Sequence, residues 1–273
     1  MLNSQLSSGI VLLIVLVALA AGAPLIAPFQ PDRIDLPARL KPPFFDGGTI
    51  THPFGTDQLG RDLFTRTLYA GRVSLVIGLV ASSLSAIVGS FAGMVAGYFE
   101  GRRGMLIVRL AEIQQAFPFL VFAIAIVAVV GAGLVPLIAA LALGSWYFYA
   151  RIAYAETRVI KQREFIEGAR AIGATHARIL IRHLLPNILP PLIVVYSFNV
   201  ASAILAESSL SFLGLGVQPS VPSWGSMISD GRGFIETAWW LTTMPGVFLF
   251  IAVLAANLLG DGLRRWMDPR GNK

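Results

Sequence analysis

Residues 164–187 read EFIEGARAIGATHARILIRHLLPN, a charged run broken by glycines between two stretches that are apolar enough to enter a lipid bilayer. The run is unusual for this chain, because 55% of the 273 residues are hydrophobic and only 13% are charged. The mean hydropathy of +0.71 is well above that of a typical soluble domain. The composition therefore indicates a membrane protein in which this run lies outside the lipid.

Six stretches are long and apolar enough to cross a bilayer, which takes roughly 20 residues each. They lie at about 9–28, 73–98, 114–131, 133–150, 187–207 and 240–260. The third and fourth are separated only by Gly131-Ala132-Gly133, so a single kinked helix is the alternative, but their combined length favours two spans. The sequence predicts an all-α integral membrane protein with six transmembrane helices.

Lysine and arginine in the loops predict the orientation, because cytoplasmic loops carry an excess of positive charge. With the amino terminus inside, fourteen of the 21 basic residues fall in inner loops or tails and seven in outer loops. Both termini are therefore expected in the cytoplasm. The same loops account for the net charge of +6 without a nucleic-acid partner.

The first apolar stretch has an alternative interpretation, since Ile10 to Ala21 could form the core of a cleaved signal peptide. The residues before it include no basic side chain, which favours a retained helix. A long outer loop follows, and its second half, HPFGTDQLGRDLFTRTLYAGRVSL (52–75), predicts a short interfacial helix that leads into the second span. The chain thus divides into residues 1–72, the first helix with its outer loop, and residues 73–273, the main membrane domain.

Gly89, Gly93 and Gly97 recur every four residues in the second span. Such a face of small residues lets another helix approach closely in lipid, so we expect these glycines at a helix–helix contact.

The quoted run itself predicts two short helices. Four apolar residues recur on one face of the first helix: Phe165, Ile166, Ala169 and Ile172. Charged residues on another face, among them Glu167 and Arg170, are spaced to pair. Gly173 should break this helix, Thr175 should cap a second one from 176 to 185, and Pro186 should end it. On periodicity alone the run could simply rest on the cytoplasmic leaflet.

The order of these residues resembles a known motif. Glu167-Gly168-Ala169, Gly173 and Leu185-Pro186 follow the EAA loop, E-A-A-x3-G-x9-I-x-L-P, of bacterial ABC importer permeases. Gly168 stands where the motif has its second alanine, and His183 stands where it has isoleucine. Neither departure affects the glycine hinge or the Leu-Pro exit.

The resemblance covers nearly the whole chain. Residues 52–75, the run AESSLSFLGLGVQPSVPSWGSMISD (206–230) and the ending NLLGDGLRRWMDP are similar to the second permease subunit of dipeptide, oligopeptide and nickel importers. The resemblance implies a type I importer-like fold in a bacterial inner membrane, with six spans and both termini inside. It also implies that residues 161–187 form a coupling helix that docks on an ATP-hydrolysing subunit, through Glu164, Glu167, Gly168, Ala169, Arg170, Gly173, Leu185 and Pro186.

The implied partners are a homologous permease, two cytoplasmic ATP-binding subunits, and a periplasmic or lipid-anchored solute-binding protein. ATP and magnesium would be bound by the ATPase subunits, since this chain has no GxxxxGK[ST] loop. Di- or oligopeptides are the expected cargo, with nickel chelates or another small solute as the alternative. The chain itself is expected to be a non-catalytic transport subunit.

Few other residues indicate chemistry. The three histidines, His52, His176 and His183, are too scattered to predict a metal site, and no nucleophilic triad is evident. Glu207 and Asn199 are polar groups at membrane depth, so they are candidates for a gate or a translocation path. Glu207 could instead cap the following turn, and Asn199 could join two helices. An ion-coupled carrier or channel would need further buried charges in the spans, and apart from Glu207 they hold none.

The outer segment 217–240 holds three tryptophans and predicts a re-entrant or interfacial hairpin. Trp239 and Trp240 are expected in the aromatic belt at the membrane surface. Contact with a solute-binding protein is the alternative role.

Overall fold

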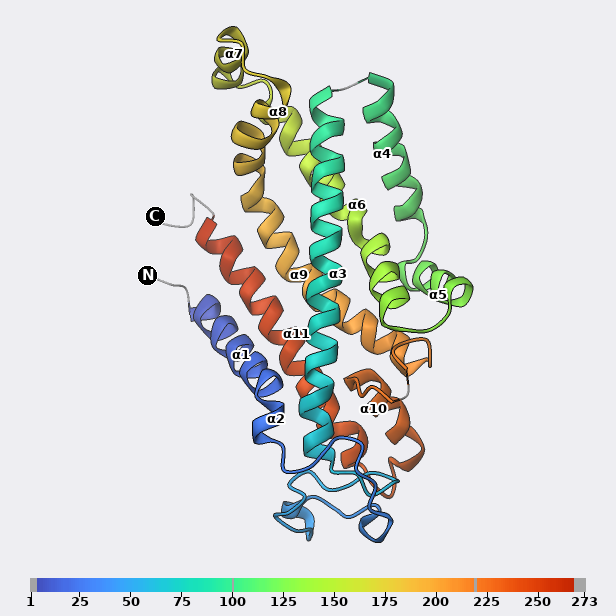
Figure 1. The fold of residues 1–273 in the computed structure, drawn as a ribbon. Coiled ribbons are helices and arrows are strands. Elements are labelled where there is room, and N and C mark those ends of the chain that lie inside the picture. Colours follow the sequence, from blue (N-terminus) through green and yellow to red (C-terminus); the bar gives the residue numbers. More distant parts are fainter. Residues whose placement is uncertain (1–3, 100, 219, 268–273) are drawn as a thin grey trace.

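The computed structural model describes residues 4–99, 101–218 and 220–267, and the regular structure within them is helical apart from one isolated antiparallel bridge between Thr56 and Asp62 (Figure 1). Arg270 and Lys273, counted above among the inner charges, lie outside the described residues. The elements in chain order are α1 (Ser4–Ala21), α2 (Ala23–Ile26), η1 (Leu36–Ala38), η2 (Phe44–Asp46), α3 (Leu63–Phe99), α4 (Gly101–Ala116), α5 (Phe119–Val130), α6 (Leu134–Ile160), α7 (Glu164–Ala171), α8 (His176–Arg178), η3 (Ile179–Leu184), α9 (Leu185–Phe212), α10 (Trp224–Gly231), η4 (Arg232–Phe234) and α11 (Trp240–Met267).

Five helical segments of the described chain are long and apolar enough to span a membrane: Ser4–Ala21, Leu63–Phe99, Leu134–Ile160, His176–Phe212 and Trp240–Met267. A sixth span exists only if α4 and α5 are counted together, and these two helices meet at an angle of 95°. The span predicted at about 114–131 is therefore not one continuous helix, because it is broken between Ala116 and Phe119. Pro118 explains the bend, because proline has no N–H to donate and disfavours a helical conformation at the residue before it.

The break at Gly131-Ala132-Gly133 is confirmed, since α5 ends at Val130 and α6 begins at Leu134. Gly131 and Gly133 have φ angles of +99° and +156°, which residues with a side chain rarely adopt. The single kinked helix that the sequence left open is therefore excluded.

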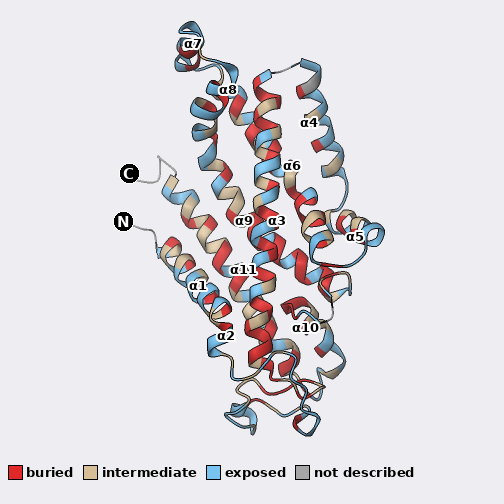
Figure 2. Ribbon diagram, viewed as in Figure 1, coloured by how far each residue is buried: buried red, intermediate tan, exposed pale blue. Residues whose placement is uncertain are grey.

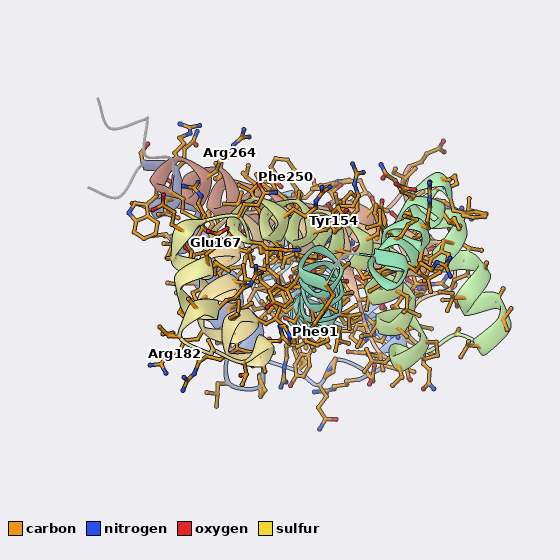
Figure 3. All side chains as sticks on the ribbon, turned by 90° about the horizontal axis from the view of Figure 1, so that it is seen from above. Phe91, Tyr154, Glu167, Arg182, Phe250 and Arg264 are labelled. Carbon is orange, nitrogen blue, oxygen red and sulfur yellow. The ribbon has the colours of Figure 1, made fainter. Side chains whose placement is uncertain are left out.

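The helix α3 runs through the middle of the bundle and is 37 residues long, about 55 Å at 1.5 Å per residue (Figures 1 and 3). It takes in residues 63–75 of the segment 52–75, so the short interfacial helix predicted there is not a separate element. The predicted division after residue 72 falls inside α3. Arg66 is only 3% exposed and reaches the Asp57 and Asp32 carboxylates at 3.6 Å each. Arg66, in the segment expected at the membrane surface, is thus buried beside two carboxylates of the outer loop.

The glycine stripe of α3 packs against α6, as its spacing predicted. A Cβ at Gly89 would lie 2.1 Å from the Trp146 carbonyl oxygen, and one at Gly93 would lie 2.1 Å from the Ala150 carbonyl oxygen. At Gly97 the nearest atom, the Tyr154 carbonyl oxygen, would be 2.8 Å away. Only glycine fits such backbone contact, so the stripe brings the two helices together.

The segment 220–240 folds back into the bundle beside α3. The indole of Trp224 is 1% exposed, lies against Gly71 and donates its Nε1–H to the Thr67 carbonyl oxygen at 3.1 Å. The helix α10 packs on α3, α9 and α11, and its re-entrant or interfacial place in the membrane stays a prediction. The buried residues concentrate along α3 and its neighbours, whereas α4 and α7 are largely exposed (Figure 2).

Trp240 does not belong to an exposed aromatic belt. Its side chain is 5% exposed and donates to the Thr56 carbonyl oxygen at 3.2 Å, while Trp239 donates to Asp46 Oδ2 at 3.2 Å. Both indoles therefore fasten the outer loop to the start of α11. Trp240 is thus enclosed by the loop, which hydropathy does not show, whereas Trp239 is partly exposed and its place in an aromatic belt stays a prediction.

The start of α1 lies beside the end of α11. A Cβ at Gly262 would lie 2.6 Å from the backbone of Leu6, and one at Gly9 would lie 2.6 Å from the Leu259 nitrogen. The two ends of the described chain are thus neighbours (Figure 1).

The α3–α6 contact can be tested with a matched pair of glycine substitutions. Gly93→Ala should destabilise the chain by about 1–3 kcal/mol, because its methyl group would overlap the Ala150 carbonyl oxygen. Gly246→Ala in α11 is the control, since a Cβ there meets no atom within 4 Å. Thermal unfolding in detergent should show a lower Tm for Gly93→Ala only. Equal Tm values for the two variants would contradict the contact.

Candidate coupling site

The charged run 164–187 lies at one end of the molecule, where α7 extends past the last turn of α3 (Figure 1). Ile166 is fully buried and Ala169 is 6% exposed, so this side of α7 faces the bundle. Phe165 and Ile172 are 48% and 86% exposed. The single apolar face predicted from the sequence is therefore divided: two residues anchor the helix, and two face outward.

The predicted coupling residues come together on α7 and at the start of α9. Ala169 is buried and Leu185 is partly buried, whereas the remaining residues are exposed: Glu164, Glu167, Gly168, Arg170, Gly173 and Pro186. The exposed residues of α7 thus form one polar surface with apolar Phe165 and Ile172 in it.

Gly173 ends α7 in the conformation that its position in the motif suggests. Its φ angle is +77°, its N–H donates to the Arg170 carbonyl oxygen at 2.9 Å, and the next N–H, of Ala174, donates to that of Ala169 at 3.0 Å. These two bonds form a Schellman motif, which requires a left-handed residue at this point. A Cβ at Gly173 would meet no atom within 4 Å, so glycine is needed for its backbone angle and not for space.

The second helix differs from its prediction. Thr175 caps it as expected, with its hydroxyl accepting from the Arg178 N–H at 3.3 Å. Pro186 does not end it, because α8, the π-helical turn η3 and α9 form one run from His176 to Phe212. Pro190 and Pro191 also lie inside α9.

The π-helical turn explains how the helix passes Pro186. The Leu185 N–H bonds five residues back, to Leu180, and the wider turn relieves the clash of a proline ring with the carbonyl four residues before it. The side-chain amide of Asn187 donates to the His183 carbonyl oxygen at 2.6 Å, so a side chain satisfies this carbonyl group. Residues 161–187, the coupling run, therefore continue from His176 onward into a membrane span.

Arg170 does not pair with Glu167 in the way the spacing suggested. Its guanidinium lies over the ring of Tyr98, 5.6 Å from the centroid. In the view along the bundle from the α7 end, the side chain of Arg182 points away from the bundle (Figure 3). Sequence reasoning did not single out Tyr98, because it lies in another helix far away along the chain.

Glu207 is buried inside α9 and accepts hydrogen bonds from three serines. Ser74 and Ser208 donate to Oε2 at 2.9 and 3.3 Å, and Ser211 donates to Oε1 at 2.7 Å. Because Glu207 lies within the helix and not before it, the capping role is wrong. Its side chain is 0% exposed. Asn199, on the same helix, is 8% exposed, and its Oδ1 has no hydrogen-bond partner among the described residues.

Within the described residues, no three His, Cys, Asp or Glu side chains are grouped so that they could hold a metal ion. Residues 161–187 thus have a buried inner side, anchored by Ile166, and an exposed outer side that is both apolar and charged.

Two family models match the chain. Residues 89–273 match the binding-protein-dependent transport system inner membrane component, and residues 6–43 match the N-terminal TM domain of oligopeptide transport permease C. The di/tripeptide transport system permease protein DppC of Pseudomonas aeruginosa (strain UCBPP-PA14) is 40% identical over 269 residues, which cover 98% of this chain and 89% of that protein. The glutathione transport system permease protein GsiD of Escherichia coli O6:K15:H31 is 39% identical over 263 residues, covering 94% and 84%.

Among solved structures, an inward-facing form of the MetNI methionine ABC transporter has a TM-score of 0.59 with 19% sequence identity, and the match covers 74% of this chain and 96% of that chain. At this identity the likeness concerns the fold, and it confirms the predicted all-helical importer-permease architecture. The chain therefore belongs to the family of binding-protein-dependent transport system inner membrane components, the non-catalytic permease subunits of ABC importers, which work in the membrane with ATPase and binding-protein partners.

Proposed function

We propose that this chain is the second permease subunit of an importer for di- or oligopeptides, and that residues 161–187 dock on a cytoplasmic ATPase. The observation that carries the docking proposal is the outer side of α7, where Ile172 is 86% exposed and Phe165 is 48% exposed. Exposed apolar side chains within a polar surface are typical of a protein interface.

The proposed complex contains this chain, a homologous permease, two ATP-binding subunits that hold ATP and magnesium, and a periplasmic or lipid-anchored binding protein. Its permeases would alternate access between the two sides of the inner membrane. The coupling residues contribute only if they make different contacts in the two states, because otherwise ATP binding could not shift the balance between them. The neighbouring ends of α1 and α11 support both termini on one side, which we assign to the cytoplasm.

Peptides are the proposed cargo because the relatives described above are named for di/tripeptide and glutathione transport. Glutathione is itself a tripeptide, so the two names describe one chemical class. Hydrolysis of ATP by the assembled complex, measured with binding protein and a panel of peptides, tests this assignment. Stimulation by a non-peptide solute but by no peptide would overturn it.

We assign the two membrane-depth candidates different roles. Glu207 accepts a hydrogen bond from the Ser74 hydroxyl, and Ser74 Oγ in turn accepts from the backbone N–H of Trp224 at 3.4 Å. The carboxylate therefore helps to hold α10 on α3 and α9. We call this role a structural latch, because the carboxylate would stabilise the packing of these three helices. Asn199, with an unpaired amide oxygen, is the better candidate for a contact along the path.

The docking surface is tested by placing a charge on it. Ile172→Asp should remove most of the co-purifying ATPase subunits, since a carboxylate would have to be desolvated in the interface. Ile50→Asp is the matched control, because Ile50 is 85% exposed but belongs to the outer loop at the opposite end. Affinity purification through a tag on this chain, followed by quantification of the ATPase subunits, gives the result. Retention of the ATPases by Ile172→Asp would contradict the proposed surface.

The hinge is tested by two alanine substitutions that both enter open space. Gly173→Ala should weaken the loop by roughly 1–2 kcal/mol, the cost of a left-handed conformation for a residue with a Cβ. Gly168→Ala, within α7, should be neutral or stabilising by up to about 1 kcal/mol, because alanine favours helix. Binding-protein-stimulated ATP hydrolysis should fall only for Gly173→Ala. Equal rates for the two variants would mean that the hinge angle does not matter for coupling.

The latch is tested at Glu207. Glu207→Leu would leave three buried hydroxyls without their acceptor, at about 1–3 kcal/mol each, whereas Glu207→Gln keeps an acceptor oxygen. In detergent we expect the highest Tm for wild type, a lower Tm for Glu207→Gln and the lowest Tm for Glu207→Leu. Glu236→Leu, at an exposed carboxylate of the same outer segment, should leave the Tm unchanged. A Glu207→Leu variant as stable as wild type would rule out the latch.

A further inference from the structure

Three side chains of the coupling run converge on one aromatic ring of α3. Tyr98 is 5% exposed and lies in the last turn of α3. Lys161, at the end of α6, Arg170 in α7 and His176 in α8 all contact it. These three residues come from before, within and after the first helix of the run, so Tyr98 holds the run at three points.

The contacts use different parts of the tyrosine. The Lys161 ammonium donates to the Tyr98 carbonyl oxygen at 2.9 Å and lies 6.0 Å from the ring centroid. The Arg170 guanidinium lies 5.6 Å from the same centroid. His176 Nδ1 is hydrogen-bonded to the phenol oxygen at 2.8 Å. Both cations are within the range of about 6 Å at which a ring face attracts positive charge.

The end of α3 favours these cations for a second reason. The last four carbonyl groups of a helix have no partner within it, and the helix dipole makes this end negative. Tyr98 is the penultimate residue of α3, so its carbonyl is one of these groups, and the Lys161 ammonium satisfies it. The same ring also packs in a core cluster with Ile166, the buried anchor of α7.

The position of α3 gives this contact a consequence. From Tyr98, α3 runs through its own glycine stripe, which packs against α6, to Gly71 and Ser74. Trp224 and Glu207 lie beside these two residues. A displacement of α7 can therefore reach the opposite end of the bundle through one rigid helix. The continuous run from His176 to Phe212 provides a separate, covalent route through α9.

We propose that Tyr98 is a positioning residue that links the coupling run to α3, so that movement of α7 is transmitted along α3 to the α10 hairpin. This inference rests on the proposed coupling function, and it adds a second route beside α9. Tyr98 would not contact the ATPase itself. Without it the ATPase would still dock on α7, but the helix bundle would respond less to that docking.

The test uses the importer complex purified through a tag on this chain and placed in nanodiscs. The measured quantity is the ratio of ATP hydrolysis with peptide-loaded binding protein to hydrolysis without it. For Tyr98→Leu we expect the stimulated increment to fall by roughly tenfold, because two ring–cation contacts and one hydrogen bond are lost. Tyr98→Phe should be intermediate, since it keeps the ring and loses only the phenol. The ATPase subunits should co-purify with both variants.

Two control variants match the chemistry without the link. Tyr154→Leu removes an arginine–tyrosine contact of 5.7 Å with Arg158, which lies within α6 and does not join the run to α3. Arg72→Met removes a cation that lies 5.7 Å from the centroid of the Tyr69 ring near the start of α3, outside the run, in contrast to Arg170→Met. The increment should fall for Arg170→Met and stay at the wild-type value for the two controls.

Amide hydrogen exchange of this chain alone in nanodiscs provides a readout that needs no ATPase. Tyr98→Leu should speed exchange in residues 164–171 and in the last turn of α3 together, and Tyr154→Leu should change neither. Ile172→Asp should lose the ATPases with unchanged exchange in α7, which separates failure of docking from failure of the link. Unchanged exchange and unchanged stimulation in Tyr98→Leu, or loss of the ATPases from that variant, would overturn the proposal.

Discussion

The backbone contact between α3 and α6 is the constraint on which the other helices depend. In lipid there is no hydrophobic force to bring two apolar helices together, so they associate through close packing and polar bonds. Gly89 and Gly93 allow this packing because hydrogen replaces a side chain that would lie 2.1 Å from a carbonyl oxygen. On other sides of α3, Gly78 receives Ile204 of α9 and Gly71 receives Trp224. The helix is thus the common partner of α6, α9 and α10.

Hydropathy was sufficient to predict most of the membrane architecture, and its errors have identifiable causes. The bend before α5 was missed because an apolar window hides Pro118, whose missing N–H decides the geometry. The burial of Arg66 and Trp240 was not predicted, because it depends on how the long outer loop folds. A loop of this kind is held by individual hydrogen bonds, such as that of Trp240 to Thr56, which no periodicity records.

The local parts of the coupling site were predictable and the distant ones were not. The helix 164–171, the hinge at Gly173 and the cap at Thr175 follow from neighbouring residues, and the structure contains all three. The division of the apolar face into buried Ile166 and exposed Ile172 depends on where the rest of the chain lies. The same is true of Tyr98, since nothing in its own surroundings in the sequence distinguishes it from another tyrosine of a membrane helix.

The π-helical turn at Ile179–Leu184 also sets the direction in which the exposed face of α7 points. An α-helix turns by about 100° per residue, so the rotation between α9 and the loop depends on how many residues lie between the hinge and the span. A π-helical turn holds one more residue than an α-helical turn over nearly the same rise. An ordinary α-helix through the same residues would carry Ile172 about one residue step, roughly 100°, further around the α9 axis. The wider turn and the number of residues between Gly173 and Pro186 therefore together fix the direction of α7.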